Sequence, residues 1–94
     1  MKTVCGLDVH KSMIHICILK ENDSKIIKEF STLTVDIYSM CDLMKEHGVE
    51  EVGMESTGIY GIPIWRILQG HFLIRFQLQS NRPAVNIVVT AFEH

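Results

Sequence analysis

The stretch "TVCGLDVHKSMIHICIL", residues 3–19, decides the fold. It contains two runs rich in apolar and β-branched residues, residues 2–7 and 13–19, separated by a short polar segment that begins at Asp8. Such runs predict two β-strands. Burying an aspartate costs free energy unless the carboxylate is paired, hydrogen-bonded or bound to a cation. We therefore expect Asp8 either at a strand end that water or a metal ion reaches, or in a turn as a capping residue.

The composition is that of one small globular domain. The 94 residues are 47% hydrophobic and 21% charged, with a formal net charge of −2, which argues against a basic surface that binds nucleic acid unaided. No apolar run reaches the roughly 18 residues of a membrane span, and no secretory signal is visible, so we expect a cytoplasmic protein without a membrane segment. Cys5, Cys17 and Cys41 form no CxxC pair and are predicted to be reduced core residues.

The middle of the chain predicts a third strand and a helix. Polar residues 20–25 indicate a turn, after which residues 26–32 return as an antiparallel strand. A helix follows, with Thr34 or Asp36 as its N-terminal cap and Gly48 at its C-terminal end. Four apolar residues share one face of this helix: Ile37, Met40, Cys41 and Met44.

The next part of the chain predicts strand, helix and strand in turn. Residues 49–54 are typical of a short buried strand, and residues 72–79 alternate as a half-exposed strand does. Between them lies an amphipathic segment that contains Pro63 and ends before Gly70. Its apolar face is formed by Tyr60, Ile64, Ile67 and Leu68. The expected fold class is α/β, with a mixed sheet of three antiparallel strands followed by parallel strands and crossover helices.

A second acid is expected beside Asp8. In a strand–helix–strand unit, the carboxyl ends of the parallel strands meet at one edge of the sheet. If strand 49–54 lies beside strand 2–7, Asp8 and Glu55, each just past its strand, become neighbours. Two close carboxylates repel each other unless a cation or a proton lies between them. Mg²⁺ or Mn²⁺ suits such a pair, and these ions promote phosphodiester chemistry. Chance placement remains an alternative, with Asp8 capping a turn and Glu55 at a helix N-terminus.

Two blocks of the sequence resemble a known family. "GLDVHKSMIHICIL", residues 6–19, followed by "GMESTGIYGIPIWRILQGHF", residues 53–72, resembles the N-terminal RuvC-like domain of the DEDD transposases of bridge-RNA-guided insertion sequences (insertion-sequence family one-hundred-and-ten). The resemblance covers residues 2–72 and implies an RNase H-like mixed sheet. By position it implies that Asp8 and Glu55 are the first two acids of a four-carboxylate Mg²⁺ or Mn²⁺ site.

The resemblance also implies partners and further site residues. DNA and a guide RNA are the expected partners, and the chain is expected to associate with itself or with a full-length transposase. His10 and Lys11 are candidates for contacting nucleic acid, with solvated turn residues as the alternative. Ser56 and Thr57 are candidates for the same role or for orienting Glu55, and helix capping is their alternative use.

The chain departs from the family pattern after the second block. Family members continue with two more aspartates and a domain that carries a nucleophilic serine, whereas the only acid here after Glu55 is Glu93. We therefore expect a RuvC-like fragment, residues 1–78, with an incomplete fold, followed by a divergent tail, residues 79–94, that is frameshifted or disordered. Residues 61–62, Gly-Ile, also replace a bulkier and more polar pair, which affects packing.

Three functions follow from these expectations. The first is a truncated transposase that is inactive alone. The second is a non-catalytic interaction module that docks on a full-length transposase. The third, a nucleotide-handling domain of the actin-like or sugar-kinase type, requires a glycine-rich phosphate loop after the acid, and residues 8–13 contain no glycine.

Overall fold

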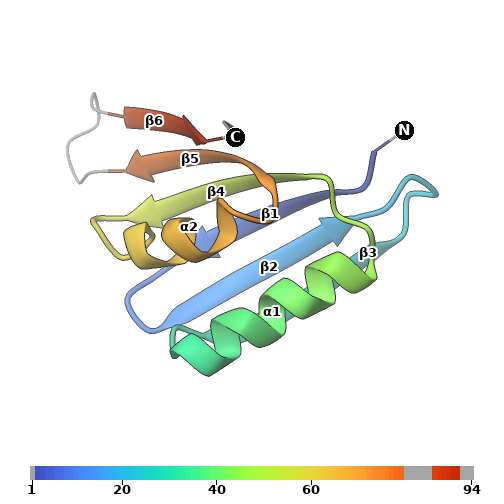
Figure 1. The fold of residues 1–94 in the computed structure, drawn as a ribbon, viewed down its shortest axis with the longest axis horizontal. Helices are drawn as coiled ribbons and strands as arrows, with labels where there is room; N and C mark the ends of the chain where they lie inside the picture. Colours follow the sequence, from blue (N-terminus) through green and yellow to red (C-terminus); the bar gives the residue numbers. More distant parts are fainter. Residues whose placement is uncertain (1, 80–85, 92–94) are drawn as a thin grey trace.

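The computed structural model describes residues 2–79 and 86–91 as a mixed sheet with two helices. The described elements are β1 (Val4–Val9), β2 (Met13–Leu19), β3 (Lys25–Ser31), α1 (Thr34–Glu46), β4 (Glu51–Thr57), α2 (Ile62–Leu68), β5 (Leu73–Gln79) and β6 (Asn86–Ala91). The strand order is β3-β2-β1-β4-β5-β6 (Figure 1). β1, β2 and β3 pair antiparallel, β1, β4 and β5 pair parallel, and β6 returns antiparallel to β5. The expected α/β class and mixed sheet are therefore confirmed.

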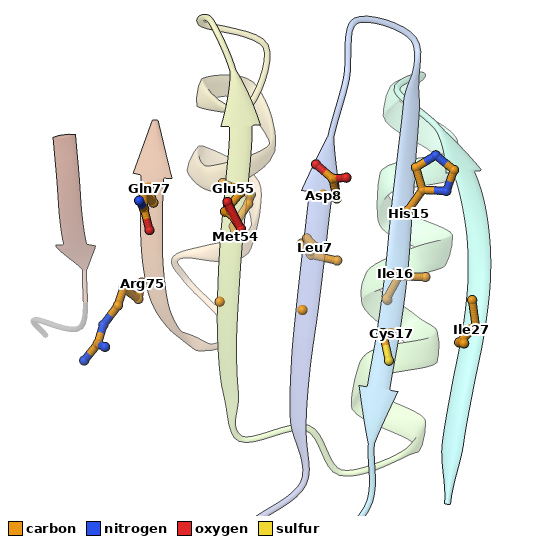
Figure 2. Close-up of a pocket in the computed structure, with 12 residues that line it drawn as sticks. Leu7, Asp8, His15, Ile16, Cys17, Ile27, Met54, Glu55, Arg75 and Gln77 are labelled. Atoms are coloured by element: carbon orange, nitrogen blue, oxygen red, sulfur yellow. The ribbon is translucent and has the colours of Figure 1, made fainter. Parts of the chain in front are cut away.

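Alternating side chains divide the sheet into two faces. Ile14, Ile16 and Ile18 of β2 are buried, whereas the residues between them face away from the core. Both described helices lie on the buried face (Figure 1), and seen from the other face they lie behind the sheet (Figure 2). The described helices thus leave the second face uncovered, and we call it the open face. A sheet with parallel strands is usually covered on both faces, so the open face is the place to search for a binding site.

The predicted stripe of α1 is confirmed, but its cap is not. Ile37, Met40, Cys41 and Met44 are all buried. The N-cap is Leu33, without a side-chain cap bond, whereas Thr34 is already helical. Asp36 instead accepts a hydrogen bond from the Ser31 hydroxyl. The capping prediction was wrong because the polar contact at the start of α1 comes from Ser31, at the end of β3. The Ser31 Oγ also accepts a hydrogen bond from the Leu33 N–H.

Gly48 ends α1 as predicted. Its φ of 71° lies in the left-handed region, which glycine adopts without steric cost. The Gly48 N–H donates to the Lys45 carbonyl, and the Val49 N–H donates to the Met44 carbonyl. These two bonds form a Schellman motif, which satisfies carbonyls that the helix end leaves unpaired. The turn directs the chain back along the sheet into β4.

The second helix is shorter than the amphipathic pattern suggested. α2 begins at Ile62, with Pro63 in its first turn, and buries Ile64 and Leu68. Tyr60 lies outside the helix and is exposed, so its placement on the apolar face was wrong. The chain reverses at Gly58, whose φ is 61°. Tyr60 belongs to this turn and precedes the first residue of α2, so it does not follow the spacing of the helical residues.

Three further expectations have definite outcomes. Cys5 and Cys41 are buried as predicted, but Cys17 is half-buried on the open face; all three are free thiols. Within the tail, residues 79–94, the structure describes Gln79 and β6, which the sequence analysis did not foresee; its other residues lie outside the described ranges, and a frameshifted origin stays a prediction. No helix among the described residues is long and apolar enough to cross a membrane.

Candidate functional site: an acid pair and a hollow on the open face

Asp8 and Glu55 are direct neighbours on the two central strands. Asp8 of β1 is the register partner of Glu55 of β4 in the parallel pair, and adjacent strands lie about 4.8 Å apart. Both side chains are exposed on the open face (Figure 2). The predicted juxtaposition is confirmed. The predicted position past the strand ends was wrong, because β1 continues to Val9 and β4 to Thr57.

The acid pair belongs to a polar row that crosses five strands. Each member is the register partner of the next, so all of them share the open face. The row runs Glu29 (β3), His15 (β2), Asp8 (β1), Glu55 (β4) and Gln77 (β5). The imidazole Nδ1 of His15 lies 3.2 Å from Glu29 Oε2. Sequence analysis missed the row because register is a property of strand pairing, which no single strand reveals.

His10 reaches back from the β1–β2 turn to hold Asp8. The turn is closed by the His10 N–H, which donates to the Met13 carbonyl at 2.8 Å. The His10 Nε2 then lies 3.1 Å from Asp8 Oδ2, and its ring meets the His15 ring edge-on at 5.6 Å. Asp8 is therefore held by a side chain from the turn and does not itself cap the turn. With Asp8 61% exposed, its carboxylate remains accessible to a ligand.

Of the other predicted site residues, two are exposed and one is buried in the core. Lys11 is exposed in the β1–β2 turn, where its carbonyl accepts the Thr32 hydroxyl, and Thr57 is exposed at the end of β4. Ser56 is only 1% exposed and points into the core, which corrects the expectation that it contacts nucleic acid. Neither hydroxyl caps α2, and Glu55 is not at a helix N-terminus, because α2 begins only at Ile62.

A hollow of about 480 Å³ lies on the open face, and Asp8 and Glu55 are part of its lining (Figure 2). Its floor contains Gly6 and Gly53, which are register partners two residues before Asp8 and Glu55. Cys17 and Arg75 also line it. A signal for this floor was present in the sequence: Gly-Leu-Asp, residues 6–8, and Gly-Met-Glu, residues 53–55, repeat the same glycine-to-acid spacing.

The donor set fits a hydrated divalent ion rather than an ion enclosed by protein ligands. Asp8 and Glu55 supply two carboxylates, and the amide of Gln77 is next in the row. Mg²⁺ typically keeps several waters and takes one or two carboxylates plus substrate phosphates. Among residues 2–79 and 86–91 there is no group of three or more His, Cys, Asp or Glu that could hold a metal ion, which a structural zinc site would require.

Comparisons with known proteins identify no relative by sequence. No family model matches the chain, and no curated protein matches it. Among solved structures, the chain is similar to the type II variant of the Aquifex aeolicus Ppx/GppA phosphatase, with 12% identity and a TM-score of 0.49 over 86% of this chain and 36% of that one. It is also similar to Saccharomyces cerevisiae Dom34, a translation termination-like factor, with 13% identity and a TM-score of 0.49 over 78% of this chain and 28% of that one.

A second Ppx/GppA structure from Aquifex aeolicus gives 14% identity and a TM-score of 0.47 over 85% of this chain and 35% of that one. The chain thus spans between 28% and 36% of the length of these structures. None of these likenesses bears on the function of this chain.

Proposed function

We propose that this chain is a RuvC-like, RNase H-like domain from the N-terminal part of a DEDD transposase, and that Asp8 and Glu55 form half of its metal site. The observation that carries the proposal is the register pairing of these two acids on adjacent parallel strands. Like charges placed directly opposite each other destabilise a sheet. The juxtaposition of two carboxylates on adjacent strands therefore supports a role in binding a cation.

The topology supports the same proposal. Three antiparallel strands lead into α1, which crosses to a strand parallel to β1, and α2 crosses to a further parallel strand. This order brings Asp8 and Glu55, 47 residues apart in the sequence, to one place on the open face. An RNase H-like mixed sheet, which the resemblance to the transposase domain implies, would have this strand order, and this agreement supports the proposal.

The roles of the side chains follow from their positions. Asp8 and Glu55 would hold Mg²⁺ or Mn²⁺, which when bound supplies charge neutralisation and an activated water at a phosphodiester. His10 Nε2, 3.1 Å from Asp8 Oδ2, would orient this carboxylate. Lys11 and Thr57 are exposed at the same end of the sheet as the acid pair, and contact of these two residues with a phosphate backbone is part of the proposal.

We expect the chain to bind the ion weakly and to be inactive alone. The family site has four acids, and Glu93, the one acid after Glu55, lies outside the described residues. Purified protein with Mn²⁺ and branched or donor DNA should therefore give no strand cleavage. Robust cleavage that Asp8→Asn abolishes would contradict this expectation and would assign a complete active site to the chain.

Metal binding itself is tested by electron paramagnetic resonance of free and bound Mn²⁺. Asp8→Asn and Glu55→Gln should each reduce binding at least about tenfold, because each removes one of two charged ligands. Matched controls are Asp42→Asn and Glu46→Gln, which make the same chemical changes at exposed positions of α1, on the far face of the sheet. Equal Mn²⁺ binding by all four variants would refute the site.

The second candidate function is a non-catalytic module that docks on a full-length transposase. The observation that favours it is the edge strand β3, whose Ile27 is 72% exposed on the open face. An exposed strand edge offers unpaired backbone groups to another chain. Co-purification of the chain with an intact transposase of this class, lost in Ile27→Lys and retained in Asp8→Asn, would favour this function over the metal-dependent one.

A further inference from the structure

The hollow beside the acid pair has a floor of bare backbone. We propose that it binds one unstacked base of a single-stranded nucleic acid, which lies flat on Gly6 and Gly53 while its phosphate lies toward Asp8 and Glu55. The inference rests on the proposed function, because the acid pair and its cation provide the neighbouring phosphate position. It adds the form of the substrate, an unpaired strand, and the orientation of one nucleotide in the site.

The fold itself does not require glycine at these two positions. Neither Gly6 nor Gly53 has a positive φ, unlike Gly48 and Gly58. A Cβ built on Gly6 or Gly53 meets no atom within 4 Å. Glycine weakens a strand interior and often marks a place where a ligand or another backbone approaches closely. Two such glycines, paired across the central strands, keep the floor of the hollow low enough for a flat group to touch backbone.

The position of the floor matches the dimensions of a nucleotide. Gly6 and Gly53 precede the acids by two residues, and strands rise about 3.3 Å per residue, so the floor lies about 7 Å from the acid row. This separation suits a base and its own phosphate. A divalent ion bound at Asp8 and Glu55 would attract the anionic phosphate to the acid row. The base of the same nucleotide would then lie over the glycines, beside Arg75, which is the register partner of Gly53.

The walls of the hollow are suited to an unpaired base. Cys17 and Ile27 present largely apolar surface on the β2–β3 side. Arg75 lines the β5 side, and its exposed side chain extends away from β4 (Figure 2). Arginine planes commonly stack on bases, and Arg75 is the arginine in the lining of this hollow. In a duplex both faces of a base are covered by its neighbours, so only a single strand offers a free face.

The test uses fluorescence anisotropy of a fluorescein-labelled oligodeoxyadenylate, with an abasic oligonucleotide of equal length as the comparison probe. Both are titrated with the full 94-residue protein with and without Mg²⁺. The decisive variant is Gly53→Val, which fills the floor in open space and introduces a good strand former. The matched control is Gly70→Val, which makes the same change in the α2–β5 loop, where a Cβ also meets nothing within 4 Å.

The inference predicts Mg²⁺-dependent binding of the adenylate strand, tighter than binding of the abasic strand by about fivefold or more. Gly53→Val should remove that difference while Mn²⁺ binding at the acids and the unfolding midpoint are retained, and Gly70→Val should match wild type. If Gly53→Val prevents folding, Gly53→Ala is used in its place, and it should also reduce the preference for the adenylate strand over the abasic strand.

Two results separate this inference from the proposed function. If Gly53→Val still binds Mn²⁺ and prefers the adenylate strand over the abasic strand as strongly as wild type does, the base site is overturned and the metal site is not. Absence of Mn²⁺ binding in wild type would overturn the metal site. In that case metal-independent adenylate binding that Gly53→Val abolishes would still support the floor, whereas no strand binding at all would overturn both.

Discussion

A methyl group at Gly61 should destabilise the fold and disturb the acid pair. Gly61 is buried where α2 begins, against β4 and β5. A Cβ built on it lies 2.6 Å from Ser56 Cβ and 2.9 Å from Phe76 Cε1. Ser56 Cβ is attached directly to the strand and Phe76 is a buried ring, so relief requires a shift of the backbone or of the core.

The expected cost of Gly61→Ala is about 1–3 kcal/mol, the usual range for overpacking a core. For a domain of this size, about 1 kcal/mol corresponds to a fall of about 4–8 °C in Tm. Urea unfolding followed by circular dichroism measures the free energy of unfolding directly. Since Ser56 follows Glu55, displacement of β4 should also weaken Mn²⁺ binding. Gly70→Ala is the control, because a Cβ there has no atom within 4 Å.

A double-mutant cycle isolates the clash. In a Ser56→Gly background the Cβ and Oγ nearest to the new methyl are gone, so Gly61→Ala should cost less by at least about 0.5 kcal/mol. The reasoning is refuted if Gly61→Ala unfolds at the same urea concentration as Gly70→Ala. If Gly61→Ala is destabilising, the bulkier pair that the family resemblance predicts at residues 61–62 cannot be accommodated in this chain without repacking.

Three further outcomes follow from burial and charge. Burial, with a smaller effect of Cys17, raises the pKa of the Cys5 thiol to about 12, so iodoacetamide at neutral pH should alkylate Cys17 well before Cys5, as peptide mass spectrometry would report. The hydrogen bond and charge of Lys2 lower the pKa of the Glu51 carboxyl. The stabilisation from this pair is present above the pKa of Glu51 in the unfolded chain and is lost as the pH falls through its pKa in the folded chain. The free energies of unfolding of wild type and Glu51→Gln should therefore converge in acid. Met40→Ala should cost about 2–5 kcal/mol in urea unfolding, because Met40 is completely buried under the sheet.

The sequence predicted the parts of the fold that depend on local periodicity. The stripe on α1, the alternation in β2 and the stop at Gly48 all came from spacing within a single element. The ends of β1 and β4 were misplaced by two or three residues because a carboxylate was taken to end each strand. On an open face a carboxylate reaches water from the middle of a strand, so Asp8 and Glu55 need not interrupt their ladders.

The candidate site was only partly predictable for a related reason. The pairing of Asp8 with Glu55 followed from the strand–helix–strand order, which a sequence pattern reveals. The contributions of His15 and Gln77 depend on register between strands, and the His10 contact depends on the path of a turn. β6 went unpredicted although its sequence, NIVVTA, is rich in β-branched residues, because no turn signal was identified before it.

The proposed function requires that the carboxylates of Asp8 and Glu55 together hold one divalent ion on the open face. Crystals of the protein soaked in Mn²⁺, with diffraction collected at a wavelength where manganese scatters anomalously, test it directly. We expect one anomalous peak between the two carboxylates, within about 2.2 Å of an oxygen from each. A peak elsewhere, or no peak beside these two side chains at saturating Mn²⁺, would contradict it.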